Sequence, residues 1–375
     1  MKKKKILILS NIAWTISTFR RYLIEELVAQ GYEVVCVADL DDFSETSVHI
    51  ITSYGAQFIR IRTDRKGINP LKDLAYVFKL LTIFRREQPD LILNYTIKPV
   101  IYGTIAAKVA KTPSFAILTG LGSSFIKKGI LSHITLLLYK VALAQSSKVF
   151  FLNETDKEVF LTKKLSSPRY SYVLPGEGID TDEYSDCGYV ADSKFRFMLI
   201  ARLLKDKGIY EYIEAARLTK KHFPNTYFYL AGTFDEGNPS AVKPKEVDSW
   251  VNQGIINYLG KTDSIKEFFA YADAIVLPSY REGLSRLLLE AASCRKPIIA
   301  TNVPGCKELV QNSVTGFLCE PENILSLAEA MEKMLLASPT ERASFGTNGR
   351  NFITENFGKD RVNAIYLTAI KEAIG

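Results

Sequence analysis

The sequence of 375 residues has little cysteine and almost no histidine. Its 5 cysteines are odd in number and contain no CxxC pair, which predicts unpaired core or loop thiols in a reducing compartment such as the cytoplasm. They are Cys36, Cys187, Cys294, Cys306 and Cys319. The 3 histidines, His49, His133 and His222, are scattered along the chain, so neither a histidine-ligated metal cluster nor a Ser-His-Asp triad has support from spacing. A G-x-G-x-x-G pattern is missing after the first predicted strand, which argues against a dinucleotide-dependent dehydrogenase.

Apolar runs long enough to cross a membrane are also missing. The lysine-rich start resembles a signal peptide, but Ser10 and Asn11 interrupt its apolar run and no convincing cleavage site follows, so a first strand over residues 6–9 is the better prediction. The next apolar stretch, residues 134–144, is about eleven residues long and contains Lys140, against the roughly twenty that a spanning helix needs. The sequence therefore predicts no transmembrane anchor.

The composition describes a globular protein with an uneven charge. It is 47% hydrophobic, 24% charged and 11% aromatic, which excludes disordered, collagenous and disulfide-stapled chains. Up to Gly178 the chain has 25 Lys and Arg against 15 Asp and Glu, a net of +10, whereas the rest has 23 against 26, a net of −3. Such asymmetry indicates an anionic partner, which could be nucleic acid, a membrane surface or a phosphorylated acceptor, or else surface lysines without a specific purpose.

Short apolar runs alternate with helical patterns throughout the chain. In the first half, strands are expected at residues 6–9, 33–38, 57–61, 91–95, 115–119 and 148–152, and helices at 19–30, 70–87, 102–110 and 132–145. In the second half, strands are expected at 195–201, 226–231, 255–259, 274–277 and 297–301, and helices at 210–222, 247–253, 265–271 and 284–293. This rhythm predicts two doubly wound α/β domains with parallel sheets, facing each other across a cleft.

A stretch rich in proline, glycine, aspartate and serine separates the two halves. We therefore predict one domain over residues 1–178 and a second over 179–357. A last helix over 358–375 is expected to pack back toward the first domain. Ligands of such folds bind beyond the carboxyl ends of the strands, where helix N-termini favour phosphate.

One of these loops carries Arg202 and Lys207, directly after the strand that ends at residue 201. The guanidinium fork and the ammonium together suit a diphosphate whose bond is breaking. An exposed basic turn before a helix is the alternative.

A second loop carries Glu282 and, eight residues later, Glu290 within an apolar helix. A carboxylate at a buried position needs a partner, which could be a ligand hydroxyl, or Arg295 or another base. Three residues at the start of this helix offer amides to an oxygen-rich ligand, namely Gly283, Leu284 and Ser285.

The two loops together resemble those of the retaining family 4 glycosyltransferases, which have the GT-B fold. The N-terminal segments Tyr95-Thr96-Ile97-Lys98-Pro99 and Thr119-Gly120-Leu121-Gly122 are similar to those of bacterial enzymes that elongate polyprenyl-diphosphate-linked sugars, among them the PglA-type N-acetylgalactosaminyltransferases. The resemblance implies that Arg202 and Lys207 bind the donor diphosphate, Glu282 the transferred sugar and Glu290 the ribose. It places the base near Gly260, Lys261 and Thr262, and makes Glu282, Arg202 and Lys207 the catalytic candidates. It also makes residues 1–178 the acceptor-binding domain and residues 179–357 the nucleotide-sugar donor-binding domain.

The resemblance implies a metal-independent enzyme, without a cofactor, that uses a UDP-sugar as co-substrate. The acceptor would be a lipid-diphosphate-linked saccharide of bacterial surface polysaccharide or glycan assembly, and the first donor to try is UDP-GalNAc. A GT-B epimerase or phosphorylase, and a non-catalytic sugar- or nucleotide-binding module, are the alternatives. The chain lacks the Gly-Gly pair and the histidine that many relatives have in the N-terminal domain. The acceptor or cleft candidates there are Asn11, Lys98, Thr119, Gly120 and Gly122, with turn formation as the alternative for the glycines.

The basic half is expected to face a membrane rather than nucleic acid. Lys127 and Lys128 precede an apolar helix over residues 134–140 that could lie in the bilayer interface, at the inner face of a bacterial plasma membrane, or could instead be a core helix. Asp39-Leu40-Asp41 matches the metal-binding DxD of another glycosyltransferase fold, but its position predicts a solvated loop.

Overall fold

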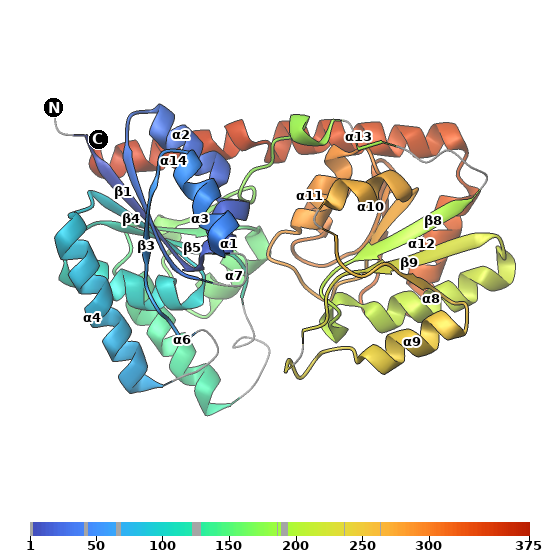
Figure 1. Ribbon diagram of the computed structural model, residues 1–375, viewed down its shortest axis with the longest axis horizontal. Helices are drawn as coiled ribbons and strands as arrows, with labels where there is room; N and C mark the ends of the chain where they lie inside the picture. The colour runs from blue at the N-terminus through green and yellow to red at the C-terminus, as the bar shows by residue number, and fades with distance from the viewer. Residues whose placement is uncertain are drawn as a thin grey trace. The chain divides into compact units, whose positions relative to one another are not determined.

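The computed structural model describes residues 3–40, 44–64, 69–121, 129–185, 187–188, 194–235, 237–262 and 264–375. The chain divides into two compact units (Figure 1). Unit 1 comprises Met1–Gly178 and Lys359–Gly375, and unit 2 comprises Ile179–Gly358. Within the described ranges, no helix combines the length and the apolar character needed to span a bilayer.

Unit 1 contains a sheet of seven parallel strands in the order β3-β2-β1-β4-β5-β6-β7. They are β1 (Lys5–Ile12), β2 (Glu33–Asp39), β3 (Gln57–Arg60), β4 (Leu91–Tyr95), β5 (Ser114–Leu118), β6 (Lys148–Phe151) and β7 (Ser171–Val173). The strand order reverses between β1 and β4, where a doubly wound sheet opens a crevice at its carboxyl edge. The predicted first strand is confirmed and extends through Ser10 and Asn11 to Ile12.

Helices cover both faces of this sheet. They are α1 (Ala13–Phe19), α2 (Arg21–Ala29), α3 (Ser44–Ser53), α4 (Pro70–Glu87), α5 (Thr104–Val109), α6 (Ile130–Leu143), α7 (Glu154–Thr162) and α14 (Lys359–Ile374), with the π-helix η1 (Pro99–Gly103) before α5. On one face Leu7 and Leu9 pack with α4 and α5. On the other, α14 packs against α2 and β4, and the Tyr95 hydroxyl donates to the Tyr366 hydroxyl over 2.9 Å.

The helix predicted over residues 19–30 was wrong at its start, because the chain breaks at Arg20 into α1 and α2. The Arg20 side chain is only 2% exposed. Its guanidinium donates to the Thr15 carbonyl at 2.7 Å and pairs with Glu177 at 3.0 Å. A buried cation needs such partners, and the backbone leaves helical geometry at this residue, with φ −113° and ψ 4°.

Unit 2 contains six parallel strands in the order β10-β9-β8-β11-β12-β13. The strands are β8 (Phe195–Ile200), β9 (Thr226–Ala231), β10 (Asn257–Tyr258), β11 (Ala274–Leu277), β12 (Ile298–Thr301) and β13 (Gly316–Cys319). The helices are α8 (Ile209–His222), α9 (Pro244–Asn252), α10 (Ile265–Tyr271), α11 (Arg286–Ser293), α12 (Ile324–Leu336) and α13 (Pro339–Phe357).

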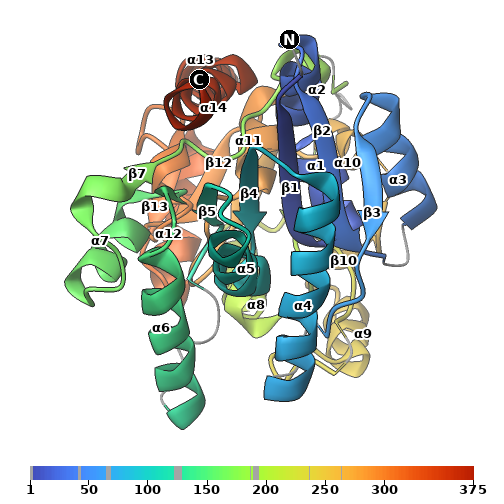
Figure 2. The same cartoon turned by 90° about the vertical axis from the view of Figure 1, so that its left-hand side faces the viewer.

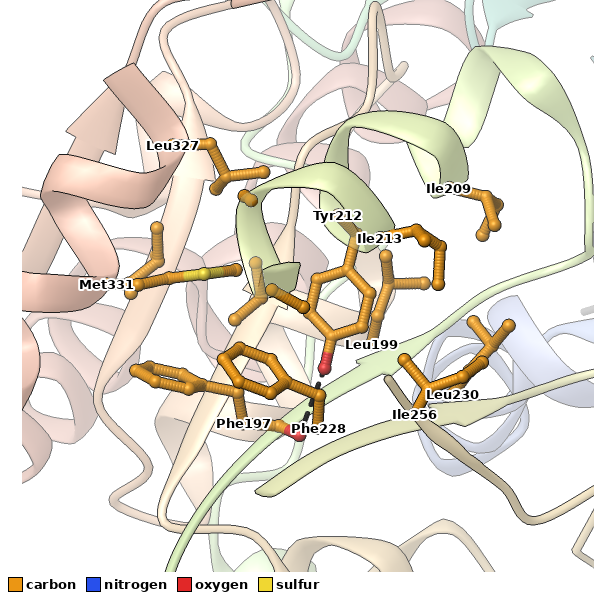
Figure 3. Close-up of a cluster of buried hydrophobic side chains, with 14 of the residues drawn as sticks. Phe197, Leu199, Ile209, Tyr212, Ile213, Phe228, Leu230, Ile256, Leu327 and Met331 are labelled. Carbon is orange, nitrogen blue, oxygen red and sulfur yellow. Dashed lines mark hydrogen bonds between the residues drawn. The ribbon is translucent and has the colours of Figure 1, made fainter. Parts of the chain in front are cut away.

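Alternate residues of β8 face the two apolar layers of unit 2. Phe197 and Leu199 pack with α8 and α12, whereas Met198 packs with α10 and α11. Figure 3 shows the first layer, in which the buried Tyr212 hydroxyl donates to the Phe197 carbonyl at 3.0 Å. The predicted α/β class with doubly wound parallel sheets is therefore confirmed in each unit.

Candidate active site

Two of the predicted donor residues, Lys207 and Glu282, come together at the switch point of unit 2, where β8 and β11 are neighbours. Arg202 and Lys207 follow β8, and Glu282 follows β11. Parallel neighbours end at the same edge of a sheet, so loops far apart in sequence meet there.

Two contacts fix these loops against each other. Lys207 ends a short 3-10 helix, and Gly208 after it has φ +70°, a value that favours glycine. A Cβ at Gly208 would lie 2.1 Å from the Pro278 carbonyl oxygen, so the close approach requires glycine. The Tyr280 amide donates to the Asp206 carbonyl at 2.9 Å. The loop after β11 therefore fixes the position of Lys207.

At the centre, the Lys207 ammonium lies 2.5 Å from Glu282 Oε1. The same oxygen accepts a hydrogen bond from Ser279 Oγ at 2.8 Å. Both charged side chains are only about one-sixth exposed, at 16% and 17%. The fixed carboxylate can accept hydrogen bonds from sugar hydroxyls, and the ammonium beside it can bind a phosphate.

A third loop, after β12, supports the Glu282 backbone. The Glu282 amide donates to the Pro304 carbonyl at 3.0 Å, and a Cβ at Gly305 would lie 2.5 Å from Glu282 carbonyl atoms. The Ser285 amide donates to the Gly305 carbonyl at 2.8 Å, and the Ser285 hydroxyl caps α11 by accepting from the Leu288 amide at 3.4 Å. Both polar groups of Ser285 therefore have partners within the protein.

Glu290 lies in α11 and is 7% exposed. Its Oε1 accepts from the Tyr184 hydroxyl at 2.9 Å and from Arg286 Nε at 2.7 Å. Arg295, one partner considered from the sequence, donates instead to the Ser185 carbonyl at 3.3 Å. The expected base is therefore Arg286, four residues earlier on the same helix, rather than Arg295. Tyr184 was not expected from the sequence.

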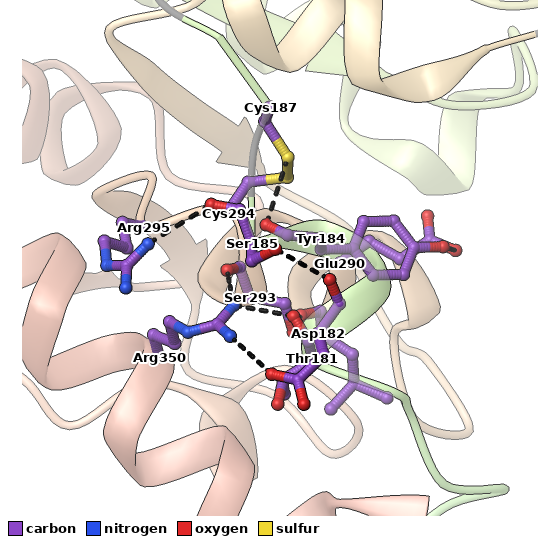
Figure 4. The surroundings of a disulfide bond; sticks show 11 residues. Thr181, Asp182, Tyr184, Ser185, Cys187, Glu290, Ser293, Cys294, Arg295 and Arg350 are labelled. Atoms are coloured by element: carbon purple, nitrogen blue, oxygen red, sulfur yellow. Dashed lines mark hydrogen bonds and ion pairs between the residues drawn. A yellow bond between two sulfur atoms is a disulfide. The ribbon is translucent and has the colours of Figure 1, made fainter.

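A disulfide next to this helix corrects the expectation of unpaired thiols. Cys187 and Cys294 are bonded, with their Cα atoms 5.6 Å apart (Figure 4). Their separation of 107 residues explains why spacing gave no hint of the pair. Cys36, Cys306 and Cys319 are buried free thiols, as predicted.

The segment before Cys187 is also held by Arg350 of α13. Its guanidinium donates to the carbonyls of Thr181 and Ser293, each at 2.6 Å, and pairs with Asp182 at 3.1 Å (Figure 4). Hydrogen bonds and a disulfide thus hold this segment on α11, and they place Tyr184 against Glu290.

Arg202 forms an ion pair of its own, separate from the Lys207–Glu282 pair. Its side chain is 61% exposed and pairs with Asp235 at 3.0 Å. Gly283 and Leu284 form the bend between Glu282 and α11.

The loop predicted to hold the base follows β10. The Gly260 carbonyl accepts from the Gly232 amide at 2.7 Å, which ties this loop to the end of β9. The Thr262 hydroxyl accepts from the Ser264 amide at 3.0 Å and donates to Glu267 at 3.1 Å, so it organises the start of α10. Lys261 between them is exposed.

In unit 1 the cleft candidates lie at the carboxyl ends of β1 and β5. Asn11 Oδ1 is buried and has no hydrogen-bond partner among the described residues. Thr119 and Gly120 follow β5 and are partly exposed. Gly122, Lys127 and Lys128 lie outside the described residues.

Lys98, the remaining candidate, pairs with the buried Asp73 of α4. Lys98 Nζ lies 2.7 Å from one carboxylate oxygen, and the Tyr102 hydroxyl donates to the other at 2.9 Å. The first role of Lys98 is therefore to neutralise a buried charge.

The DxD-like segment was expected to be a solvated loop, which is wrong for Asp39. Asp39 ends β2 and is partly buried, and its carboxylate accepts from the amides of Leu40 at 2.8 Å and Thr63 at 2.9 Å. Asp41 lies outside the described residues. Over the part of the chain that the structure describes, no group of three or more His, Cys, Asp or Glu side chains is placed to hold a metal ion.

Family models match both units. The model described as "Glycosyl transferases group 1" matches residues 183–352, and the one described as "Glycosyl transferase 4-like" matches residues 5–153. Together they span most of the chain and both groups of candidate residues.

Similar proteins agree with these matches. The N,N'-diacetylbacillosaminyl-diphospho-undecaprenol alpha-1,3-N-acetylgalactosaminyltransferase of Campylobacter jejuni is 28% identical over 87% of this chain and 88% of its own. The capsular polysaccharide biosynthesis glycosyltransferase CapM of Staphylococcus aureus is 25% identical over 88% and 91%. The crystal structure of Anabaena HepE with UDP-glucose has a TM-score of 0.78 at 20% identity and covers 98% of this chain and 99% of its own, which shows a shared fold.

Proposed function

This chain belongs to the glycosyltransferases, and we propose that it moves a sugar from a UDP-sugar to a polyprenyl-diphosphate-linked saccharide, with retention of configuration. The observation that carries the proposal is the Lys207–Glu282 ion pair at the switch point of unit 2. The name of the Campylobacter relative supports a lipid-diphosphate acceptor and makes UDP-N-acetylgalactosamine the first donor to test. The name of the Staphylococcus relative supports a role in surface polysaccharide assembly.

On the donor side, Arg202 and Lys207 would neutralise the diphosphate as the sugar departs. Glu282, held by Lys207 and Ser279, would accept hydrogen bonds from hydroxyls of the transferred sugar. Glu290 would accept from the ribose hydroxyls. Backbone and loop groups of Gly260, Lys261, Thr262, Gly283 and Leu284 would complete the contacts with the nucleotide and the sugar. The Ser285 amide, which the sequence also suggested, donates to the Gly305 carbonyl instead.

The proposed transfer takes place on one face of the sugar. The acceptor hydroxyl attacks the anomeric carbon on the side of the leaving group, the bond from that carbon to the diphosphate breaks, and the departing phosphate oxygen takes the hydroxyl proton. Because the basic side chains supply positive charge for the leaving diphosphate, we propose that the reaction needs no metal ion.

On the acceptor side, unit 1 would meet the lipid-linked saccharide at an anionic membrane surface, on the cytoplasmic side of the membrane. Asn11, Lys98, Thr119 and Gly120 lie at or just beyond the carboxyl ends of its strands. Two helices that begin at that edge, α4 and α6, extend past the same end of the sheet (Figure 2). They carry large exposed apolar side chains at helical spacing, namely Leu71, Leu74 and Phe78 on α4 and Ile134, Leu137 and Val141 on α6. Such stripes are typical of interfacial helices.

A UDP-release screen tests the proposal. Purified protein is given several UDP-sugars, with and without polyprenyl-diphosphate saccharides, and each reaction is repeated with EDTA. Acceptor-dependent UDP release that persists in EDTA supports transfer without a metal. Interconversion of the UDP-sugar without an acceptor would indicate an epimerase, and release of a sugar phosphate would indicate a phosphorylase. Binding of the UDP-sugar without turnover would indicate a non-catalytic binding module.

A further inference from the structure

A hollow of about 440 Å³ opens in unit 1 where β2 and β3 end, and α4 forms one of its walls. It lies at the carboxyl edge of the sheet, beside the outer strands rather than at the switch point between β1 and β4. Four basic and three acidic side chains contribute to its lining: Arg60, Arg62, Lys72, Lys79, Asp39, Asp64 and Asp73.

The carboxylate of Asp39 is already satisfied by the protein. One oxygen accepts from the Leu40 amide at 2.8 Å and the other from the Thr63 amide at 2.9 Å. Arg60 lies 3.6 Å from the first oxygen. Asp39 and Arg60 thus neutralise each other and brace the two loops that flank the hollow.

The other two carboxylates have cationic partners as well. Asp64 pairs with Lys72 at 3.0 Å. Asp73 pairs with Lys98 at 2.7 Å and accepts from the Tyr102 hydroxyl at 2.9 Å. The acidic side chains of the hollow are therefore balanced.

Three other polar groups in the lining, Arg62, Lys79 and the Tyr76 hydroxyl, take no part in these pairs. Arg62 and Lys79 are exposed, and neither has an ion-pair partner among the residues that the structure describes. The Tyr76 side chain is only 4% exposed, and its hydroxyl is buried without a hydrogen-bond partner in the same described part. Burial, with the charge of Asp39, raises the pKa of Tyr76, so this hydroxyl stays protonated and can donate. An unsatisfied buried donor and two uncompensated cations in the lining of one hollow point to an anionic ligand.

We propose that this hollow binds a phosphate-bearing group, with Arg62 and Lys79 paired to phosphate oxygens and the Tyr76 hydroxyl donating to one of them. Two cations match the charge of a phosphate monoester or a diphosphate, whereas a carboxylate would use one. The volume has room for more than a single phosphate. Which molecule carries the phosphate is inferred from the proposed function. At a membrane surface it is either an anionic lipid headgroup or the diphosphate of a lipid-linked saccharide. The exposed apolar side chains Leu74 and Phe78 of α4 would face the lipid there.

Calorimetric titration of inorganic pyrophosphate into the full chain, with UDP present in saturating amount, tests the site. We expect binding that weakens at least about tenfold in Arg62→Gln with Lys79→Gln, and several-fold in Tyr76→Phe, which keeps the ring and removes the donor. Arg85→Gln with Arg86→Gln removes two positive charges from exposed positions near the end of α4 and should leave binding unchanged. Absence of pyrophosphate binding, or binding that only Lys207→Ala reduces, would overturn the proposal.

Two further measurements distinguish the source of the phosphate. If Arg62→Gln with Lys79→Gln lowers co-sedimentation with phosphatidylglycerol vesicles but not with phosphatidylcholine vesicles, the site binds a lipid headgroup. A raised KM for the lipid-linked acceptor with unchanged vesicle binding would assign it to the acceptor diphosphate. Pyrophosphate binding is measured without turnover, so failure of the pocket and failure of the proposed sugar transfer are separate results.

Discussion

Lys207 and Glu282 are joined by an ion pair of 2.5 Å although 75 residues separate them in the sequence. The pair exists because β8 and β11 are adjacent at the switch point and because Gly208 lets the first loop lie directly on Pro278. Ser279 donates to the same carboxylate oxygen. The carboxylate is therefore oriented before any ligand arrives, which is what an electrostatic role in group transfer requires.

Loss of either member of this pair should abolish most turnover. We expect Glu282→Ala and Lys207→Ala each to lower kcat by about a hundredfold or more, because each removes a charge that the proposed mechanism uses at the reacting bond. Circular dichroism and thermal melting should show that both variants stay folded. Lys205→Ala is the matched control, since Lys205 is exposed on the same 3-10 turn. Near-normal UDP release by both variants would contradict the assigned site.

The packing of Gly208 against Pro278 can be tested with a second glycine. Gly208 and Gly254 have nearly the same φ, +70° and +68°, but a Cβ at Gly254 would meet nothing within 4 Å. Gly254→Ala should cost only the left-handed strain, about 1 kcal/mol. Gly208→Ala should cost about 1–3 kcal/mol more, because the new methyl group meets the Pro278 carbonyl. Thermal melts of the two variants, with UDP-release rates, measure the difference, and equal Tm values would contradict the role of the contact.

Strong local patterns predicted much of the fold from the sequence. The apolar run of β9 and the proline start of α4 gave those elements their observed bounds. The helix α3 (Ser44–Ser53) was missed, because its composition is polar and β-branched and shows little helical period. The strand β7 has only three residues, so periodicity had too little to act on.

At the candidate site, the sequence predicted residues but few of their contacts. Spacing and the family resemblance indicated Glu282 and Glu290, and parallel-sheet topology then explained why Glu282 meets Lys207. The contact of Tyr184 with Glu290 spans 106 residues and depends on how the segment after the first domain returns to α11. No local pattern encodes such a contact, and the same holds for the disulfide that follows Tyr184.

Tyr184 should contribute to nucleotide affinity through Glu290. Tyr184→Phe removes one donor to Glu290 Oε1 and leaves Arg286 in place, so we expect UDP to bind about two- to tenfold more weakly. Glu290→Gln should weaken binding further, because the ribose would lose its charged acceptor. Calorimetric titration with UDP measures both effects. Tyr170→Phe, at an exposed tyrosine of unit 1, is the control, and an unchanged Kd in Tyr184→Phe with Glu290→Gln would exclude this ribose contact.

Thiol labelling should separate the five cysteines into two groups. Burial raises the pKa of Cys36 and of Cys306, and raises that of Cys319 to about 12, so these thiols should resist alkylation in the folded protein at neutral pH. Cys187 and Cys294 should label only after reduction. Mass spectrometry of air-oxidised protein, before and after reductant, counts the modified sites, and denatured, reduced protein supplies the full count. Alkylation of Cys187 in unreduced protein would contradict the disulfide.

The exposed apolar stripes of α4 and α6 should determine membrane binding. Leu74 and Leu137 are 53% and 61% exposed, so replacing both with glutamate leaves the core intact and places charge where lipid would be. We expect partition onto vesicles of phosphatidylcholine and phosphatidylglycerol to fall at least about tenfold, from lost apolar burial and from repulsion by the anionic lipid. Leu325→Glu with Leu336→Glu adds the same charge at exposed positions of α12 in unit 2 and serves as the control. The basic half should add a salt-dependent component, so high salt should weaken wild-type binding without abolishing it. If both double variants co-sediment as the wild type does, the bilayer does not meet unit 1 through these helices.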